Sequence, residues 1–207
     1  MVENGTAGNT NNTVNEIIWN LRGKRFKRKD IICERGDPAS RLLLCAGAAS
    51  IDGHNSEKGN WIRIPVVAPA VIGEEIVAGK ALYAETITAF TECYVRSITP
   101  ESSRIPVFQS YLDRLSARQH LWLQKSILDR KRPLEDQIIS LFVYLSTQSS
   151  RFGKTHLTND DIGEFLGCTR ETVNKVLREK LRAKFDLPSR ITLGDLAPFQ
   201  SKREVAK

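Results

Sequence analysis

Histidine is scarce in this chain, and its distribution argues against catalysis. The 207 residues include three histidines, His54, His120 and His156, which are far apart in the sequence. They are not accompanied by a Ser/His/Asp set, a cluster of metal ligands or a glycine-rich phosphate loop. We therefore expect no catalytic residue, no metal site, no bound cofactor and no enzymatic activity.

Cysteine is also sparse, and long apolar runs are missing. The four cysteines, Cys33, Cys45, Cys93 and Cys168, are widely separated and form no Cys-x-x-Cys pair. Reduced thiols are therefore expected in place of a disulfide framework. The chain also lacks a secretory signal and any apolar run of membrane-spanning length. These absences predict a cytoplasmic protein without membrane contact.

The most informative stretch, residues 157–181, is typical of two short helices joined by a tight turn. In the first helix, Ile162, Phe165 and Leu166 recur at helical spacing. Thr158 or Asn159 would cap its start. Gly167 follows the last apolar residue, where a left-handed end is easiest for a residue without a Cβ.

The second helix of this pair carries long polar side chains on one face. Thr169 caps its start. Its inward-facing residues are Val173, Val176, Leu177 and Leu181. Its outward-facing residues are Arg170, Glu171, Asn174, Lys175 and Arg178. This arrangement predicts a DNA-binding helix-turn-helix.

The charge distribution favours a polyanionic partner. The net charge is +7, and residues 170–190 hold seven basic side chains against three acidic ones. That excess lies on and just after the proposed reading helix, where phosphate contacts are expected. A second basic run, residues 22–29, is far away in sequence, and we interpret it as a solvated face.

The N-terminal half is typical of a β-barrel. Residues 1–13 are polar and predict a disordered leader. Residues 14–106 begin with a short helix and continue as short apolar runs separated by turn signals. The predicted strands are 31–33, 42–44, 48–51, 61–67, 85–90 and 93–98. Strands at this spacing indicate an antiparallel barrel or jelly roll.

Residues 107–132 predict one long helix with no internal proline or glycine. Its Phe108, Leu112, Leu115, Gln119 and Trp122 follow the 4-3 spacing of a coiled coil. We predict a dimer seam formed by Leu112, Leu115, Gln119 and Trp122. The alternative is that this face packs on the chain's own barrel. Pro133 ends the helix, and residues 133–207 would form a winged helix-turn-helix domain, with a small strand at 190–193.

This order of elements, from Phe26 onward, resembles the cyclic-AMP receptor protein and fumarate/nitrate reduction regulator (CRP/FNR) family. The strongest match is the run Ile162–Val173, IGEFLGCTRETV; Leu115–Ala117 and Glu34–Asp37 support it. The resemblance implies an α+β protein: an N-terminal jelly-roll barrel of the cyclic-nucleotide-binding type, a long dimerisation helix and a C-terminal winged helix-turn-helix. It further implies a homodimer on double-stranded DNA.

The resemblance also assigns roles on the reading helix. It places the base-reading side chains at Arg170, Glu171 and Lys175. Arginine can pair with guanine O6 and N7, and glutamate can accept from cytosine N4. Lys175 stands where the cyclic-AMP branch has arginine, which predicts a relaxed base preference there. Expected phosphate contacts are Thr158, Thr169, Thr172, Asn174 and Arg178. A two-fold symmetric operator with TGTGA-like half-sites is expected.

The match is weaker at the sensing end. Gly73 and Glu74 supply the Gly-Glu step of the cyclic-nucleotide binders, but Tyr83-Ala84-Glu85 replaces their Arg-Ser-Ala and lacks the phosphate-binding arginine. Cyclic AMP is therefore not the expected effector. Arg118 matches an arginine of a 2-oxoglutarate-sensing branch, whose acidic partner is Leu123 here. The candidate effector pocket comprises Gly73, Glu74, Arg118 and Ser126.

The favoured interpretation is a homodimeric, sequence-specific transcription regulator with a divergent sensor. If the protein is an activator, RNA polymerase would be a further partner; activation or repression, and the effector, are left open. The alternative is a small-molecule or redox-sensing module that acts through protein–protein contacts. A redox role would suit Cys168, because the nearby helix start could lower its thiol pKa.

Overall fold

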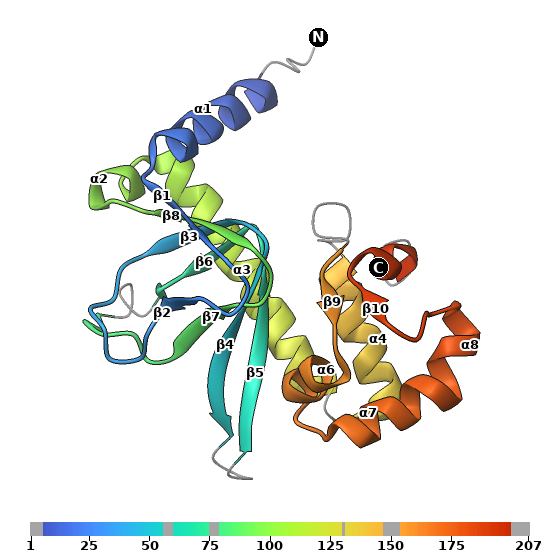
Figure 1. Ribbon diagram of the computed structural model, residues 1–207. Helices are drawn as coiled ribbons and strands as arrows, with labels where there is room; N and C mark the ends of the chain where they lie inside the picture. The colour runs from blue at the N-terminus through green and yellow to red at the C-terminus, as the bar shows by residue number, and fades with distance from the viewer. Residues whose placement is uncertain (1–5, 56–59, 75–78, 130, 147–153, 200–207) are drawn as a thin grey trace.

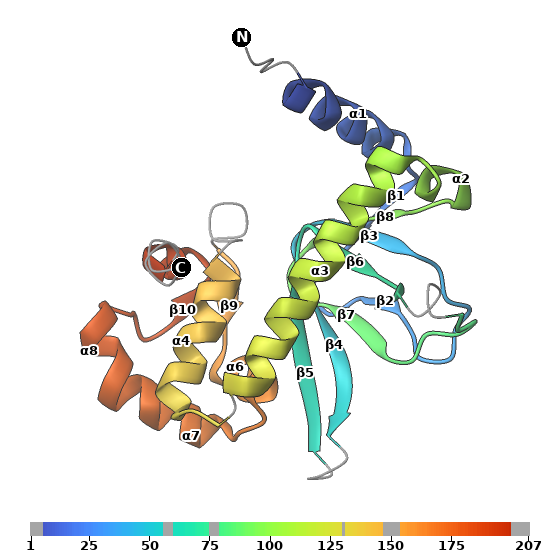
Figure 2. The ribbon, with the colours of Figure 1, turned by 180° about the vertical axis from the view of Figure 1, so that it is seen from behind.

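A computed structural model describes residues 6–55, 60–74, 79–129, 131–146 and 154–199. A β-barrel and a helical domain lie side by side, and the long helix α3 (Pro106–Asp129) runs between them (Figure 1). Seen from behind, α3 crosses the outer face of the barrel and leads to the helical domain (Figure 2). No helix in the described part of the chain is both long and apolar enough to cross a membrane.

The barrel consists of two four-stranded sheets that face each other. One has the order β1 (Gly23–Phe26), β8 (Cys93–Ser97), β3 (Leu42–Ala46) and β6 (Ala70–Ile72). The other has the order β2 (Ile31–Cys33), β7 (Thr86–Ala89), β4 (Ala48–Asn55) and β5 (Asn60–Val67). Neighbouring strands are antiparallel. The alternation of side chains along a strand puts Leu42 and Leu44 between the sheets and Leu43 on the outer face.

The predicted jelly-roll class of barrel is confirmed, with two strands that the sequence did not predict and an N-terminal helix that starts earlier than predicted. β1 lies within the basic run 22–29, whose charged residues concealed the strand but suit a sheet edge. β6 is only three residues long. The expected disordered leader is wrong for residues 6–13, because they form the first half of α1 (Thr6–Asn20). The buried Arg96 donates to the carbonyls of Trp19 and Leu21 and so satisfies the end of this helix.

α3 covers the outer face of the first sheet. Phe108 and Leu112 are fully buried and Leu115 is 6% exposed, in a cluster with Leu43 and Val71 of the barrel. The predicted dimer seam is therefore wrong for Leu112 and Leu115, which face the chain's own sheet. A 4-3 spacing marks an apolar face of a helix but does not say which surface that face covers. Gln119 is half-buried, and the side chain of Trp122 lies outside the described residues.

The opposite face of α3 is free in the single chain. Side chains at 4-3-4-3 spacing are exposed along it: Ser110, Arg114, Ala117, Leu121 and Gln124. Leu121 is 66% exposed, which is unusual for a leucine in mid-helix. Any helix partner of α3 would have to meet this stripe.

The helical domain follows the proline break. It contains α4 (Leu134–Leu145), β9 (His156–Leu157), α6 (Asn159–Leu166), α7 (Arg170–Val176), a π-helical turn (Leu177–Leu181), α8 (Arg182–Phe185), β10 (Ile191–Thr192) and a 3-10 helix (Gly194–Phe199). β9 and β10 pair antiparallel to form a minimal ribbon. The short α2 (Pro100–Ser103) precedes α3 and starts at the N-cap Thr99.

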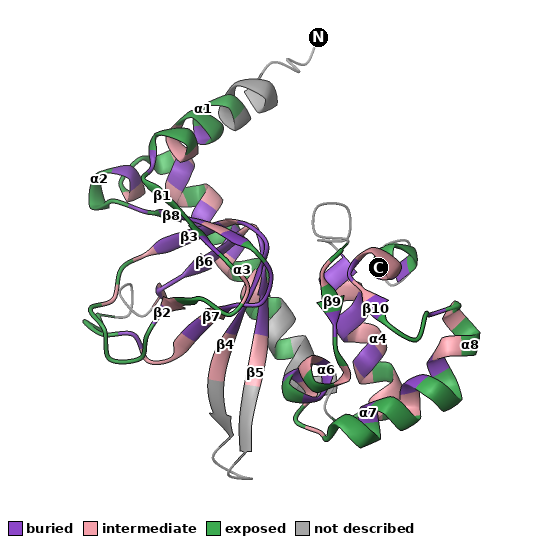
Figure 3. Ribbon diagram, viewed as in Figure 1, coloured by how far each residue is buried: buried purple, intermediate pink, exposed green. Residues whose placement is uncertain are grey.

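One apolar cluster joins the two parts of the molecule. The core of the helical domain includes Ala48, Val67 and Phe90, which belong to the barrel. The Phe90 ring meets Phe165 of α6 edge-on, with 5.1 Å between centroids. The burial map shows purple segments on both sides of this junction (Figure 3). The helix-turn-helix is therefore packed on the β-barrel.

We predict that Leu112→Ala lowers the free energy of unfolding by about 2–5 kcal/mol, because it opens a cavity under a fully buried side chain. Chemical denaturation of the isolated variant measures this value. Leu121→Ala, at an exposed position of the same helix, is the matched control and should change stability by less than about 0.5 kcal/mol if monomers are compared. Equal effects of the two substitutions would contradict the burial of Leu112.

Candidate nucleic-acid interface

The first helix of the helix-turn-helix starts with a complete capping box. The Thr158 hydroxyl accepts from the Asp161 amide at 3.1 Å, and the Asp161 carboxylate accepts from the Thr158 amide at 2.8 Å. Two of the unpaired amides at the helix start are thereby satisfied. Of the two caps expected, Thr158 is the observed one.

The turn between the two helices depends on two glycines. Gly167 ends α6 with φ of 69°, the left-handed conformation predicted for it. A Cβ on Gly163 would lie 2.6 Å from the Cys168 carbonyl oxygen, so only glycine lets the turn approach the helix this closely. These local requirements determine the angle at which α7 leaves the turn.

α7 presents a polar face to solvent. Thr169 caps it by accepting from the Thr172 amide at 3.3 Å, and Val173 and Leu177 are fully buried beneath it. The exposed residues Glu171, Asn174, Lys175 and Arg178 follow i, i+3, i+4, i+7 spacing, so they share one side of the helix. Arg170 is exposed at its first position. All three predicted base readers are therefore accessible, and they lie within two helical turns.

The expected phosphate contacts surround this face. Thr158, Thr169 and Thr172 stand at the starts of α6 and α7, where amides and the helix dipole favour anions. Asn174 lies on α7 and Arg178 on the π-helical turn that continues it, and all five side chains are exposed. Asn159 Nδ2 donates to Asn174 Oδ1 at 3.3 Å, which ties the two helices together.

Local acidic groups partly occupy the cationic side chains. Arg170 lies 3.6 Å from Asp160, and both side chains are at least 60% exposed. A pair of this kind contributes only about 0–1 kcal/mol, so a base or phosphate can displace Asp160 at little cost. A π-helical turn then extends α7 and buries Leu177 and Leu181. Lys180 and Lys184, beyond α7, pair with Glu135 of α4.

Two arginines of the barrel reach the helix-turn-helix, and the sequence did not indicate either contact. Arg28 donates to the His156 carbonyl at 2.9 Å and to the Asp161 carboxylate at 3.0 Å. Arg63 of β5 donates to Glu164 of α6 at 2.6 Å while also holding Asp52. The only sequence signal was the basic run 22–29, interpreted above as a solvated face. For Arg28 that interpretation is incomplete.

The cysteine of the turn has a perturbed thiol, in the direction opposite to redox activation. Burial raises the pKa of Cys168. A raised pKa lowers the thiolate population that reacts with oxidants. The lowered pKa suggested by the nearby helix start is therefore not what this environment produces.

The predicted effector residues are spread along the junction of α3 and the barrel. Gly73 has φ of 81°, and the Glu74 carboxylate lies 3.8 Å from His120 of α3. Arg118 donates to the Pro69 carbonyl at 2.5 Å. The side chain of Ser126 lies outside the described residues. Among the described residues, no group of three His, Cys, Asp or Glu side chains could hold a metal.

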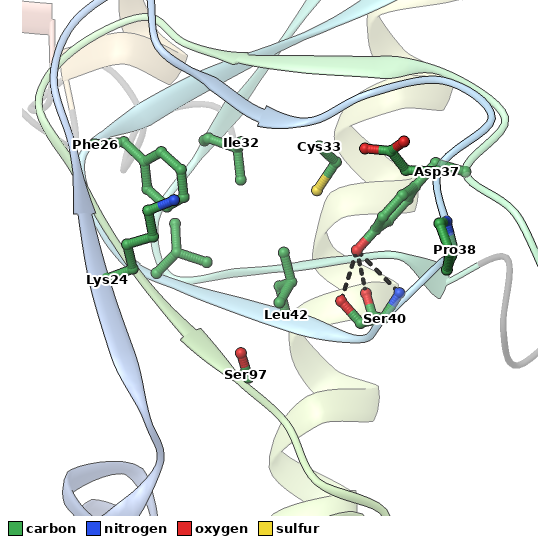
Figure 4. A pocket seen from close by; sticks show the side chains of 11 residues that line it. Lys24, Phe26, Ile32, Cys33, Asp37, Pro38, Ser40, Leu42 and Ser97 are labelled. Atoms are coloured by element: carbon green, nitrogen blue, oxygen red, sulfur yellow. Dashed lines mark hydrogen bonds between the residues drawn. The ribbon is translucent and has the colours of Figure 1, made fainter.

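Tyr83 stands where the resemblance expects a phosphate-binding arginine. Its hydroxyl donates to the Ser40 carbonyl at 2.6 Å and accepts from the Ser40 amide at 3.0 Å (Figure 4). Burial raises the pKa of Tyr83 to about 12. At this position the neutral Tyr83 phenol therefore forms hydrogen bonds with Ser40.

Comparisons with known proteins agree with this geometry. The family model for bacterial regulatory proteins of the crp family matches residues 156–184. No match is found among curated proteins. The solved structure of TTHB099, a CRP-family transcriptional regulator from Thermus thermophilus, has 24% identity and a TM-score of 0.68, over 89% of this chain and 97% of that one.

Two further solved structures share the fold. TTHA1359, a CRP/FNR-family regulator from Thermus thermophilus, has 19% identity and a TM-score of 0.64, over 86% of this chain and 98% of that one. The c-di-GMP responsive global regulator CLP of Xanthomonas campestris has 18% identity and a TM-score of 0.62, over 87% of this chain and 95% of that one.

The helix-turn-helix is of the type found in DNA-binding bacterial transcription regulators, and the barrel has the fold that accompanies it in the solved regulators. Residues 156–184 match the crp family of bacterial regulatory proteins, and most of the chain shares its fold with solved CRP/FNR-family regulators.

We predict that Tyr83 contributes stability that is complete below pH 10 and is lost as the pH rises towards 12. The protonated phenol is the form that the fold favours, because the pKa rises from 10.0 to about 12 on folding. The excess free energy of unfolding of the wild type over Tyr83→Phe should shrink in this range by at most about 3 kcal/mol. Chemical denaturation at several pH values measures it, and a constant difference would contradict the prediction.

Proposed function

We propose that the protein binds a two-fold symmetric operator as a homodimer and reads each half-site with Arg170, Glu171 and Lys175 of α7. The exposure of all three side chains on a capped helix carries this proposal. Arg170 suits guanine, Glu171 suits cytosine, and Lys175 would supply a less directional charge. Thr158, Thr169, Thr172, Asn174 and Arg178 would hold the flanking phosphates, and TGTGA-like half-sites are proposed from the resemblance.

The exposed stripe of α3 supports a homodimer. Ala117, Leu121 and Gln124 lie at coiled-coil spacing on the side of α3 that the barrel leaves free. Because the buried residues Leu112 and Leu115 serve the barrel, this stripe replaces them as the proposed seam. A two-fold dimer would place its two α7 helices about one DNA turn apart, roughly 34–36 Å.

The barrel–helix contacts support a mechanism for control. Phe90, Arg28 and Arg63 hold α6 against the barrel, so α6 would follow any movement of these residues. A ligand would regulate DNA binding by favouring one arrangement of this junction over another. Tyr83 in place of an arginine supports an effector other than cyclic AMP. On the resemblance alone, we propose activation through RNA polymerase, which transcription in vitro from an operator-bearing template would measure.

We expect Arg170→Ala to weaken operator binding about tenfold or more, because one bidentate base contact is worth about 1–3 kcal/mol. Operator sequences selected from random duplexes provide the ligand, and fluorescence anisotropy measures the affinity. Arg35→Ala, an exposed arginine in a barrel turn, has the same charge change and should leave affinity unaltered.

The same titrations against an unrelated duplex separate base reading from charge. Arg170→Ala should lose less affinity there, since only a charge contact is removed. Equal losses on both duplexes would refute base reading by Arg170. Wild-type binding that does not depend on sequence or on salt would refute the proposed function as a whole.

We expect Leu121→Arg to shift the protein from dimer to monomer, because it places a charge at the centre of the proposed seam. Sedimentation velocity measures the distribution. Leu82→Arg is the matched control, since Leu82 is also an exposed leucine, 52% exposed, on the barrel. An unchanged dimer in Leu121→Arg, or a monomeric wild type at micromolar concentration, would sink this seam.

A further inference from the structure

The barrel has a pocket that lies apart from the predicted effector residues. It opens beside the edge strands β1 and β2, has a volume of about 570 Å³, and receives no lining residue from α3 (Figure 4). Its floor is apolar and buried, formed by Phe26, Leu42 and Val95. Small-molecule sites typically have volumes of about 300–1,000 Å³.

Two opposite charges face this pocket from different sides. Lys24 projects from β1, with its Nζ 4.7 Å from the centre of the Phe26 ring. Among the described residues, no carboxylate forms an ion pair with Lys24. Asp37 lies on the opposite side, next to Pro38 and Ser40 (Figure 4). The Tyr83 and Ser40 hydroxyls already form hydrogen bonds between these two residues. Lys24 is therefore the charged group that is available to bind an anionic ligand.

The alternative interpretation is that the pocket is an open end of the barrel that holds only water. Against it, buried aromatic and aliphatic side chains form the floor, so the inner end of the pocket presents apolar groups and not hydrogen-bonding partners for water. The Lys24 ammonium lies above that floor, so it favours a ligand that carries a negative charge next to its apolar body. The far carboxylate of Asp37 would repel a second anionic group. The pocket thus has a defined polarity from one side to the other.

We propose that this pocket binds a small molecule with an apolar body and a single carboxylate. The carboxylate pairs with the Lys24 ammonium, and the apolar body covers Phe26, Leu42 and Val95. Asp37 excludes dicarboxylates of the same length. This site goes beyond the proposed function, because DNA reading by α7 does not require it.

Isothermal titration calorimetry on the full-length protein tests the site, with octanoate as the probe and octanedioate as the matched dianion. We expect octanoate to bind once per chain and octanedioate to bind about tenfold more weakly. Lys24→Met keeps the length of the side chain and removes its charge, so it should weaken octanoate binding about tenfold, equivalent to 1.4 kcal/mol. Lys27→Met, an exposed lysine near β1 that does not line the pocket, is the control.

Asp37→Asn is a second test of the same site, and it does not depend on the folding of Lys24→Met. This variant should bind octanedioate nearly as well as octanoate, because the repelling charge is gone. Absence of octanoate binding at millimolar concentration, or equal binding by wild type and a folded Lys24→Met, would overturn the proposal. Operator affinity of Lys24→Met without octanoate should equal that of the wild type, so failure of this site is distinguishable from failure of DNA reading.

Discussion

The arrangement of the molecule depends on the apolar contact between α6 and the barrel. Phe165 inserts its ring edge-on against Phe90, and the Val67 amide donates to the Tyr144 hydroxyl at 3.1 Å beside it. Edge-on aromatic pairs contribute about 0.5–1.5 kcal/mol beyond the area they bury. The Arg63–Glu164 pair at the rim is about half exposed and contributes little to stability, but it restricts the rotation of α6. Apolar burial attaches α6 to the barrel, and the ion pair orients α6 on it.

This attachment gives α7 a defined position relative to the barrel. α7 is connected to α6 by a turn in which Gly163 and Gly167 leave little freedom. α6 is in turn held by the barrel. The barrel therefore positions the helix-turn-helix through its first helix, α6. An attachment of this kind lowers the orientational entropy that α7 would lose on binding DNA.

The helix-turn-helix could be predicted closely from the sequence because its determinants are local. Thr158, Gly167 and Thr169 act within one helical turn of their own positions, and all three have the predicted roles. The outward face of α7 follows from spacing alone. Spacing does not identify the surface that an apolar helix face covers. For this reason the sequence predicted a partner subunit opposite Leu112 and Leu115, where the structure has Leu43 and Val71 of the barrel.

Contacts between distant residues were beyond such reasoning. Arg63 and Glu164 are 101 positions apart, and neither stands in a motif that indicates their pairing. Charged residues also concealed β1, because Lys24 and Arg25 break the alternation of an edge strand that keeps only Phe26 buried. At Tyr83 the sequence showed that an arginine was missing. It did not show that a phenol would occupy the place by bonding to Ser40.

The turn after β1 has a role that its exposed position does not suggest. Lys27 and Asp30 close it with two hydrogen bonds, one of them from the Lys27 amide to the Asp30 carboxylate at 2.7 Å. Only Lys27 separates Phe26, on the floor of the barrel, from Arg28, which bonds to the start of α6, and a link of that length spans at most about 7 Å. Surface turns commonly accept insertions. An extra residue here would shift Arg28 away from Asp161 or Phe26 out of the barrel interior. The length of this turn is therefore fixed by two contacts, although the turn lies at the surface.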